Sequence, residues 1–148
     1  TLLQINLGAA AEINRLIVRD KVKQKTLRLI HVGSTASIEA VGSVGYNVVK
    51  SALAGYVRSL GRKLIKNKVI VTGILPGGFI AQGNAMERLK KKNNKAYKKF
   101  IKTRLPRGIM GDVNEILPLL LFLCSSHSSM MGSCLVPIDG GEGKTYQA

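Results

Sequence analysis

The sequence predicts an α/β fold, a doubly wound parallel sheet whose strands alternate with long helices. Three short apolar runs indicate buried strands, and stretches of helical periodicity separate them. Strands joined through helices pair in parallel by right-handed crossovers, and parallel strands that are buried on both faces are apolar throughout. The 148 residues amount to one domain or to part of one.

The first predicted helix covers residues 2–18, where apolar residues recur every three or four positions without a proline. The run LRLIHV over 27–32 predicts a buried strand, and a loop of small residues follows it. A long amphipathic helix is predicted over 45–66. Its expected apolar side consists of Val48, Val49, Ala52, Leu53, Val57, Leu60 and Leu64.

The second half of the chain continues the alternation. The run VIVTGIL over 69–75 predicts a second strand, and one or two short basic helices are expected over 84–103. A helix over 112–124 begins at an aspartate, and Glu115 three residues later completes a capping-box pattern. CLVPI over 134–138 predicts the third strand. Open sheets of this kind bind ligands beyond the carboxyl ends of their strands, so the residues after each strand are candidates for a site.

The chain is strongly basic, because 23 Lys and Arg residues against eight Asp and Glu residues give a net charge of +15. Ten of the basic residues lie within 86–107, where Glu87 is the single acidic residue. Solvated helix faces are the plainest interpretation, a site for an anionic ligand is the second, and nucleic acid is the third. The absence of Trp and an aromatic content of 5% argue against a platform for stacking nucleic-acid bases.

Several other classes of protein are excluded. The longest apolar run, over 116–124, contains a proline and is too short to cross a bilayer, so we expect no membrane partner. The first residues lack the features of a signal peptide. Cys124 and Cys134 match no metal-binding spacing, so no metal site is expected. Both cysteines are expected to be reduced core residues of a cytoplasmic protein.

A tyrosine and a lysine one helical turn apart carry the candidate chemistry. Tyr46 and Lys50 project from one face near the start of the long helix. The ammonium and the positive end of the helix both favour the phenolate, so they lower the tyrosine pKa from about 10 and suit it to proton transfer. Ser34, at the end of the preceding strand, can donate a hydrogen bond to a substrate carbonyl oxygen. Taken alone, Tyr-x-x-x-Lys is a weak signal.

The order of the motifs around this pair is more specific. Asn6 lies in INLG, Ser34 in HVGST and the pair in YNVVK, and the motifs ILPGGF, RLPRGIMGDVNEI and SSMMGSCLVPIDGG follow. With these motifs the chain resembles the short-chain dehydrogenase/reductase family over almost its whole length. The resemblance implies a Rossmann-like fold, NAD or NADP as cofactor, and hydride transfer between nicotinamide and the carbonyl or alcohol of a small-molecule substrate.

The resemblance also implies roles for individual residues. Tyr46 would be the catalytic acid/base, and Lys50 would lower its pKa and hold the nicotinamide ribose. Ser34 would bind the substrate carbonyl, and Asn6 would anchor a water of the proton relay. The implied cofactor-contacting residues are Tyr46, Lys50, Pro76, Gly77, Phe79 and Ile80.

The chain departs from the family at its front. The glycine-rich phosphate loop, G-x-x-x-G-x-G, does not occur, and three strands are predicted where such folds have about six in two halves. GGEGKT near the end mimics another phosphate-binding motif but has Ile138 where the first glycine belongs. We therefore expect residues 1–148 to be a single partial domain, the second half of the family's fold, inactive alone and part of a longer protein. The strand at 27–32 would then be an unpaired apolar edge.

The resemblance places the family's variable substrate lid at the basic segment 84–107, whose charge an anionic substrate would suit. A weaker likeness points to family members of bacterial surface-sugar and flagellin-modification pathways. Small residues on the two long helices favour a homodimer or homotetramer, and packing within one chain is the alternative. The alternative function is a non-catalytic module that binds an anionic partner through its lysines.

Overall fold

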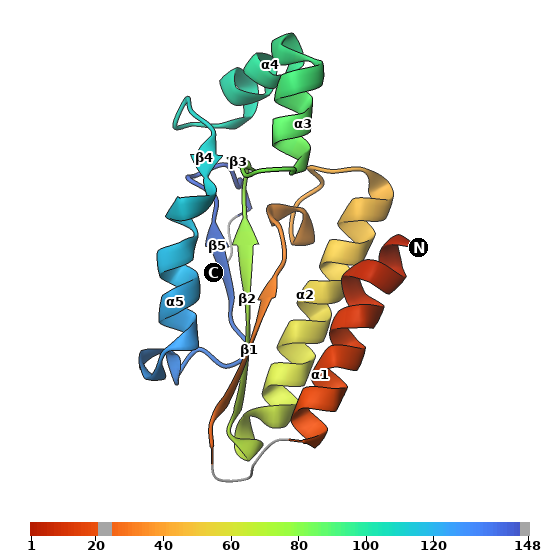
Figure 1. Cartoon of the computed structure of the whole chain (residues 1–148), viewed down its shortest axis with the longest axis vertical. Helices are drawn as coiled ribbons and strands as arrows, with labels where there is room; N and C mark the ends of the chain where they lie inside the picture. Colours follow the sequence, from red (N-terminus) through yellow and green to blue (C-terminus); the bar gives the residue numbers. More distant parts are fainter. Residues whose placement is uncertain (21–24, 146–148) are drawn as a thin grey trace.

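The computed structural model describes residues 1–20 and 25–145 and shows a parallel sheet with helices on both faces (Figure 1). In the described part of the chain this sheet has three strands in the order β1-β2-β5. The strands are β1 (Leu27–Val32), β2 (Val69–Pro76) and β5 (Leu135–Ile138), and both pairings are parallel. The predicted α/β class and parallel pairing are therefore confirmed.

The central strand β2 is buried along its whole length between β1 and β5. Gly73 of β2 pairs with His31 on one side and Leu135 on the other. A Cβ atom at Gly73 would lie 2.7 Å from Leu135 Cδ2, so glycine permits this close approach. β1 lies at an edge of the sheet, as expected for residues 27–32.

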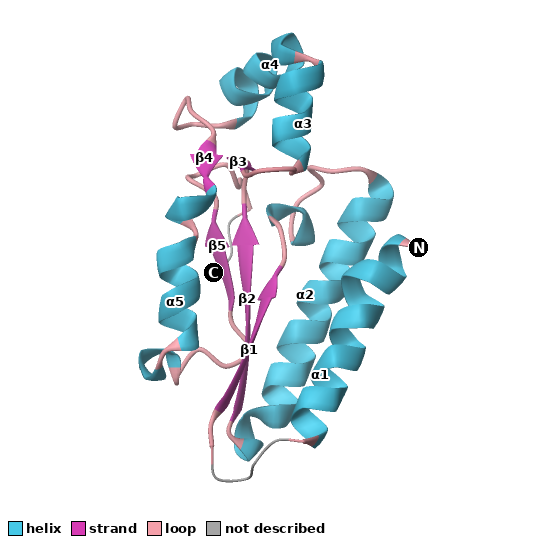
Figure 2. Ribbon diagram, viewed as in Figure 1, coloured by secondary structure: helices cyan, strands magenta, loops and turns pink. Residues whose placement is uncertain are grey.

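Helices cover the sheet in two layers. The helices α1 (Ala9–Arg19) and α2 (Val44–Leu64) lie on one face, and α5 (Leu117–Cys124) lies on the other (Figure 2). Because successive residues of a strand point to opposite faces, the core is divided in the same way. The cluster under α2 consists of Leu29, Leu53, Val57, Val69 and Val71, and the cluster under α5 contains Ile74, Ile116 and Leu123.

The apolar side of α2 differs from the predicted one at Val48. The stripe that faces the sheet follows Val49, Leu53 and Val57, which are four residues apart and buried. Val48 lies about 100° around the helix from Val49 and is 59% exposed. The prediction that Val48 belongs to the packed side is therefore wrong.

The helix predicted over 2–18 contains a change of winding. Its described form is a π-helical turn over Gln4–Gly8 followed by α1. The backbone N–H of Ala9 donates to Gln4 O across the wider turn. This turn packs against α2. Single π-turns of this kind are frequent at functional sites, which makes the turn a candidate part of one.

The basic segment forms two helices, α3 (Ala85–Lys92) and α4 (Asn94–Arg104), beyond the carboxyl end of β2 (Figure 1). The side chains of Asn84 and Asn93 accept hydrogen bonds from backbone N–H groups of the first turns and so cap both helices. The sequence left open whether this segment holds one helix or two, and the second cap explains the break.

A second, two-stranded sheet was not predicted. The strand β3 (Phe79–Ile80) pairs in parallel with β4 (Gly111–Asp112), and two residues are too few to show a periodicity. Because β3 precedes α3 and β4 follows α4, the pair joins the two ends of the basic segment. The predicted capping box of Asp112 and Glu115 is confirmed, although it begins a 3₁₀ turn ahead of α5.

The cysteines are only partly as expected. Both are free, but Cys124 is exposed and Cys134 is half-buried, so the prediction that Cys124 lies in the core is wrong. α5 is apolar on all sides, and Leu123 is its buried residue. Within 1–20 and 25–145 no helix is long and apolar enough to cross a membrane, and no group of acidic, histidine and cysteine side chains could hold a metal ion.

Candidate active site

A cleft opens beyond the carboxyl ends of β1 and β2, between the start of α2 and the α3–α4 segment. Its volume of about 430 Å³ falls in the range of about 300–1,000 Å³ that is usual for small-molecule sites. The residues that line it include Ser34, Tyr46, Gly77, Arg104 and Glu142. Two predicted catalytic residues, Ser34 and Tyr46, are thus brought together at the sheet edge where folds of this class bind ligands.

Ser34 lies two residues after the end of β1 in an extended conformation. The strand end is fixed because the N–H of Gly33 donates to Ile74 O at 2.8 Å. Ser34 Oγ accepts the N–H of Ala36 at 3.1 Å and caps the short 3₁₀ turn that follows. A hydroxyl both accepts and donates, so the Ser34 proton can still be donated to a ligand oxygen in the cleft.

Tyr46 lies in the first turn of α2. Ser43 Oγ accepts the Tyr46 N–H at 3.3 Å, which caps the helix and sets where it begins. Tyr46 is 36% exposed and lines the cleft. The positive end of the α2 dipole therefore lies beside the phenol, where it favours a negative charge.

Lys50 lies one helical turn after Tyr46 and is 9% exposed. Its Nζ atom lies 5.7 Å from the centroid of the Tyr46 ring and donates to Val32 O at 3.4 Å. Burial lowers the pKa of Lys50 below its ordinary value. The ammonium is thus held between the end of β1 and the phenol, in surroundings where its field is stronger than in bulk water.

Asn6 lies in the π-helical turn, and its side chain is used within that turn. Asn6 Nδ2 donates to Leu2 O at 3.0 Å. Leu2 lines the cleft, whereas Asn6 does not. The structure therefore bonds Asn6 to a residue that lines the cleft but does not place Asn6 in the lining with Ser34 and Tyr46.

The predicted cofactor loop divides between the cleft and the strand pair beside it. Pro76 is buried at the end of β2, and Gly77 lines the cleft. Phe79 and Ile80 form β3, and neither residue lines this cleft. Phe79 lines a smaller cavity of about 50 Å³ next to β4. Of this set, only Gly77 shares the cleft with Ser34 and Tyr46.

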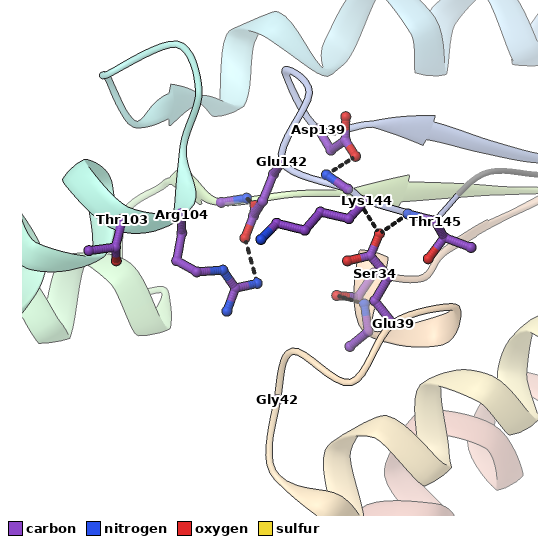
Figure 3. Close-up of polar contacts among 12 residues, drawn as sticks. Ser34, Glu39, Gly42, Thr103, Arg104, Asp139, Glu142, Lys144 and Thr145 are labelled. Atoms are coloured by element: carbon purple, nitrogen blue, oxygen red, sulfur yellow. Dashed lines mark hydrogen bonds and ion pairs between the residues drawn. The ribbon is translucent and has the colours of Figure 1, made fainter.

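An ion pair between a buried carboxylate and a partly exposed guanidinium, which the sequence did not single out, lines the same cleft (Figure 3). Glu142 is 6% exposed, and its carboxylate accepts the N–H of Gly78 at 2.5 Å. Arg104 Nη2 donates to Glu142 Oε1 at 3.3 Å, and the guanidinium lies 5.8 Å from the centroid of the Phe100 ring. Glu142 follows two loop glycines, and Arg104 is one of ten basic residues in its segment, so neither stands out in the sequence.

The segment that carries Glu142 is held against the rim of the cleft (Figure 3). Asp139 accepts two backbone N–H groups of the glycine turn, each at 2.9 Å. The Glu39 carboxylate accepts the N–H of Lys144 at 2.5 Å and that of Thr145 at 2.9 Å. These backbone donors, Thr145 first, lower the pKa of Glu39. Two carboxylates thus fix the loop on either side of Glu142.

Comparison with known proteins identifies the family of this chain. Residues 1–142 match the family model described as enoyl-(acyl carrier protein) reductase. The chain is 28% identical over 142 residues to the 3-oxoacyl-(acyl-carrier-protein) reductase FabG of Aquifex aeolicus, a match that covers 94% of this chain and 54% of that protein. The FabG of Pseudomonas aeruginosa is 27% identical over 139 residues, covering 92% of this chain and 53% of that protein. The chain thus spans about half the length of these curated relatives.

Solved structures agree on the fold. The L-sorbose reductase of Gluconobacter frateurii, complexed with NADPH and L-sorbose, matches with a TM-score of 0.86 at 22% identity, over 98% of this chain and 58% of that one. RhlG of Pseudomonas aeruginosa, in an active-site complex with NADP, matches with a TM-score of 0.80 at 26% identity, over 95% and 58%. From the family match over residues 1–142 and the order of the motifs, the chain belongs to the short-chain dehydrogenase/reductase family.

Proposed function

We propose that this chain is the catalytic half of an oxidoreductase that uses NAD or NADP and transfers hydride between nicotinamide and a carbonyl or alcohol. The observation that carries the proposal is one cleft lined by both Ser34 and Tyr46, with the Lys50 ammonium 5.7 Å from the tyrosine ring. The relatives from Aquifex aeolicus and Pseudomonas aeruginosa are reductases, and the structure of RhlG contains NADP, which supports the same reaction type.

The proposed chemistry follows from charge development. A bound nicotinamide supplies or accepts the hydride. During reduction, negative charge grows on the carbonyl oxygen, and the Ser34 hydroxyl stabilises it by donating a hydrogen bond. Tyr46 delivers its phenolic proton to that oxygen, and the Lys50 ammonium stabilises the phenolate left behind. In the oxidation direction the Tyr46 phenolate takes the proton of the alcohol.

The residues present fit the nicotinamide half of the cofactor. The wall of the cleft at Gly77 and its neighbouring glycine carries no side chain, and Tyr46 offers a hydroxyl to a ribose. Lys50 does not line the cleft, so we propose that its Nζ, which donates to Val32 O, turns to the ribose when the cofactor binds. Because Phe79 and Ile80 lie beside the cleft, we propose that they contact the cofactor only through their backbone. We likewise propose that Asn6 holds a relay water only through its backbone. The sequence has no glycine-rich phosphate loop, so we propose that the chain alone does not turn over substrate.

The substitution Tyr46→Phe tests the proposal. In the full-length protein it removes the transferable proton but keeps the ring, so NADPH-dependent reduction of carbonyl compounds should fall by about 10²–10⁴-fold while NADPH binding persists. Tyr97→Phe is the matched control, because Tyr97 is a buried tyrosine of α4 that does not line the cleft. Activity retained in Tyr46→Phe would reject the assigned role.

The alternative is a non-catalytic module that binds a polyanion through residues 86–107, whose lysines lie in α3 and α4. Binding of this kind weakens steeply with salt, because it releases condensed counterions. A salt titration with duplex DNA therefore separates the two functions. Tight, salt-sensitive binding together with an inactive Ser-Tyr-Lys set would favour the module.

We further propose a homodimer or homotetramer in which α1 and α2 pack against a second copy. Ile13 and Ile17, four residues apart on α1, are 55% and 42% exposed, and Val44 and Val48 on α2 are 84% and 59% exposed. Exposed apolar side chains that gather on neighbouring helices are typical of interaction surfaces. Free thiols at both cysteines support a cytoplasmic location. Ala85, Met86, Phe100 and Arg104 line the cleft, which supports the part of residues 84–107 as a substrate lid.

A further inference from the structure

We propose that the cleft takes a substrate that carries an oxyanion, a carboxylate or a phosphate, and that Arg104 binds this group. The inference rests on the proposed function, because it assumes that the reacting carbonyl lies at Ser34 and Tyr46. Among the described residues that line the cleft, Arg104 is the single basic one. It comes from α4, across the cleft from the Tyr46 end of α2.

Arg104 is held in a position that suits a ligand. Its side chain is 32% exposed, lies over the Phe100 ring and contacts Glu142 Oε1 through one nitrogen, Nη2. A guanidinium has five N–H donors in a planar fork, and this fork matches the geometry of carboxylate and phosphate. A single contact at 3.3 Å engages only part of that fork. The remaining edge can bind an oxyanion in the cleft.

Glu142 acts as a positioning residue for Arg104 and also as an internal competitor. Its side chain is 5% exposed, and the Gly78 N–H fixes the carboxylate beside the cleft. A fixed carboxylate orients the guanidinium, but it also repels an incoming anion. Removing the charge of Glu142 while keeping its shape should therefore strengthen anion binding, which a purely structural contact would not do.

The rest of the cleft fits the same substrate class. Leu2, Val41, Met86 and Phe100 line it with apolar surface, which suits a carbon chain between the carbonyl and the anion. The exposed lysines of α3 and α4 lie outside the lining and attract anions from a distance. Their contribution is screened by salt, whereas that of the partly buried Arg104 is screened much less.

The test is a binding titration that needs no turnover. The isotope-labelled protein is titrated with levulinate and with dihydroxyacetone phosphate, and with the neutral counterparts methyl levulinate and dihydroxyacetone, while amide chemical shifts are followed by NMR. The variants are Arg104→Gln, Arg104→Lys and Glu142→Gln. Lys102→Gln is the matched control, because Lys102 is an exposed residue of the same helix and its loss changes the net charge equally.

The expected result is an affinity for at least one anion that is about tenfold higher than for its neutral counterpart, in moderate salt. Arg104→Gln should abolish this preference, Arg104→Lys should reduce it, Lys102→Gln should keep it, and Glu142→Gln should increase it. The preferred anion distinguishes a carboxylate substrate from a phosphate substrate. If Arg104→Gln does not fold, Glu142→Gln still tests the inference. It should bind the anion more tightly than the parent does, and unchanged or weaker binding would contradict the inference.

Equal affinity for anion and neutral counterpart, no binding of either anion, or a preference that survives Arg104→Gln overturns the inference. The two proposals fail separately. Tyrosine-dependent reduction of neutral ketones without anion preference refutes only the role of Arg104. An anion preference in a protein whose turnover ignores Tyr46→Phe refutes only the proposed catalysis.

Discussion

The Lys50 ammonium lies 5.7 Å from the centroid of the Tyr46 ring and is anchored by a hydrogen bond of 3.4 Å to Val32 O. Burial disfavours the charged form of an amine, and this is the reason that the pKa of Lys50 is lowered. The position therefore costs the fold stability. What the protein gains is a fixed positive charge behind the phenol.

Replacing Lys50 with methionine should separate these two effects. Methionine fills similar space without a charge, so the free energy of unfolding at neutral pH should rise by roughly 1 kcal/mol, while turnover of the full-length protein is lost. Urea unfolding measures the first effect, and Lys102→Met, an exposed change, is the control. A Lys50→Met variant that is less stable than the parent at neutral pH contradicts this reading.

The lowered pKa of Lys50 also predicts how the stability of the fold depends on pH. Because the folded-state pKa of Lys50 lies below its ordinary value of 10.5, the unfolded chain binds more protons than the folded chain between those two values. The stability contributed at this site therefore rises with pH across that window. The stability difference between Lys50→Met and the parent should narrow as the pH approaches 10.5, and unfolding curves at neutral and alkaline pH measure it.

His31 should make stability depend on pH in the same direction, but at acid pH. Its Nε2 atom lies 3.0 Å from Asn14 Nδ2, its ring packs edge-on against Tyr56 at 5.9 Å, and burial lowers its pKa. Because the Asn14 amide nitrogen donates, the facing Nε2 accepts and the ring is neutral. The unfolded chain takes up this proton first, so stability should fall as the pH drops from 6.5 through the lowered pKa.

Thermal unfolding across this range checks the assignment. His31→Gln should flatten the decline, whereas His127→Gln, at an exposed position, should leave it unchanged. An undiminished decline in His31→Gln would assign the acid sensitivity to another group.

Much of the fold could be predicted because its main elements have strong local patterns. β2 is apolar at nearly every position since both of its faces are buried, and α2 combines an N-cap with an apolar stripe. β3 and β4 could not be predicted, because each has two residues and depends on pairing across the α3–α4 segment. The π-helical turn over Gln4–Gly8 likewise follows from packing against α2, for which QINLG carries no local signal.

The candidate site likewise contains residues that the sequence could place and residues that it could not. Tyr46 and Lys50 could be placed together because one helix carries both, and Ser34 because it follows a strand that ends at the same sheet edge. The contact between Arg104 and Glu142 joins residues that are 38 positions apart in the sequence. No spacing rule joins such a pair, and only the folded chain reveals it.

Leu123 should carry most of the packing of α5. It is 1% exposed within the cluster under that helix, whereas Leu121 on the same helix is 71% exposed. Leu123→Ala should therefore lower the free energy of unfolding by about 2–5 kcal/mol, because it leaves a cavity. Leu121→Ala should change it by about 0.5 kcal/mol or less. Denaturant unfolding compares the two, and similar losses would refute the packing assigned to α5.

Val48 offers the sharpest test of the proposed assembly. A valine that is 59% exposed contributes little to a monomer, so Val48→Glu should leave the unfolding of the monomer nearly unchanged. At an interface between copies, the same change would bury a carboxylate and should weaken association by about 2 kcal/mol or more, roughly thirtyfold. Sedimentation measured over a range of protein concentrations distinguishes the cases.

Ile109→Glu, at a position 57% exposed in the loop after α4, is the matched control, since it adds the same charge away from α1 and α2. A parent protein that is monomeric would refute the proposed assembly. An assembly that tolerates Val48→Glu but not Ile109→Glu would place the interface elsewhere.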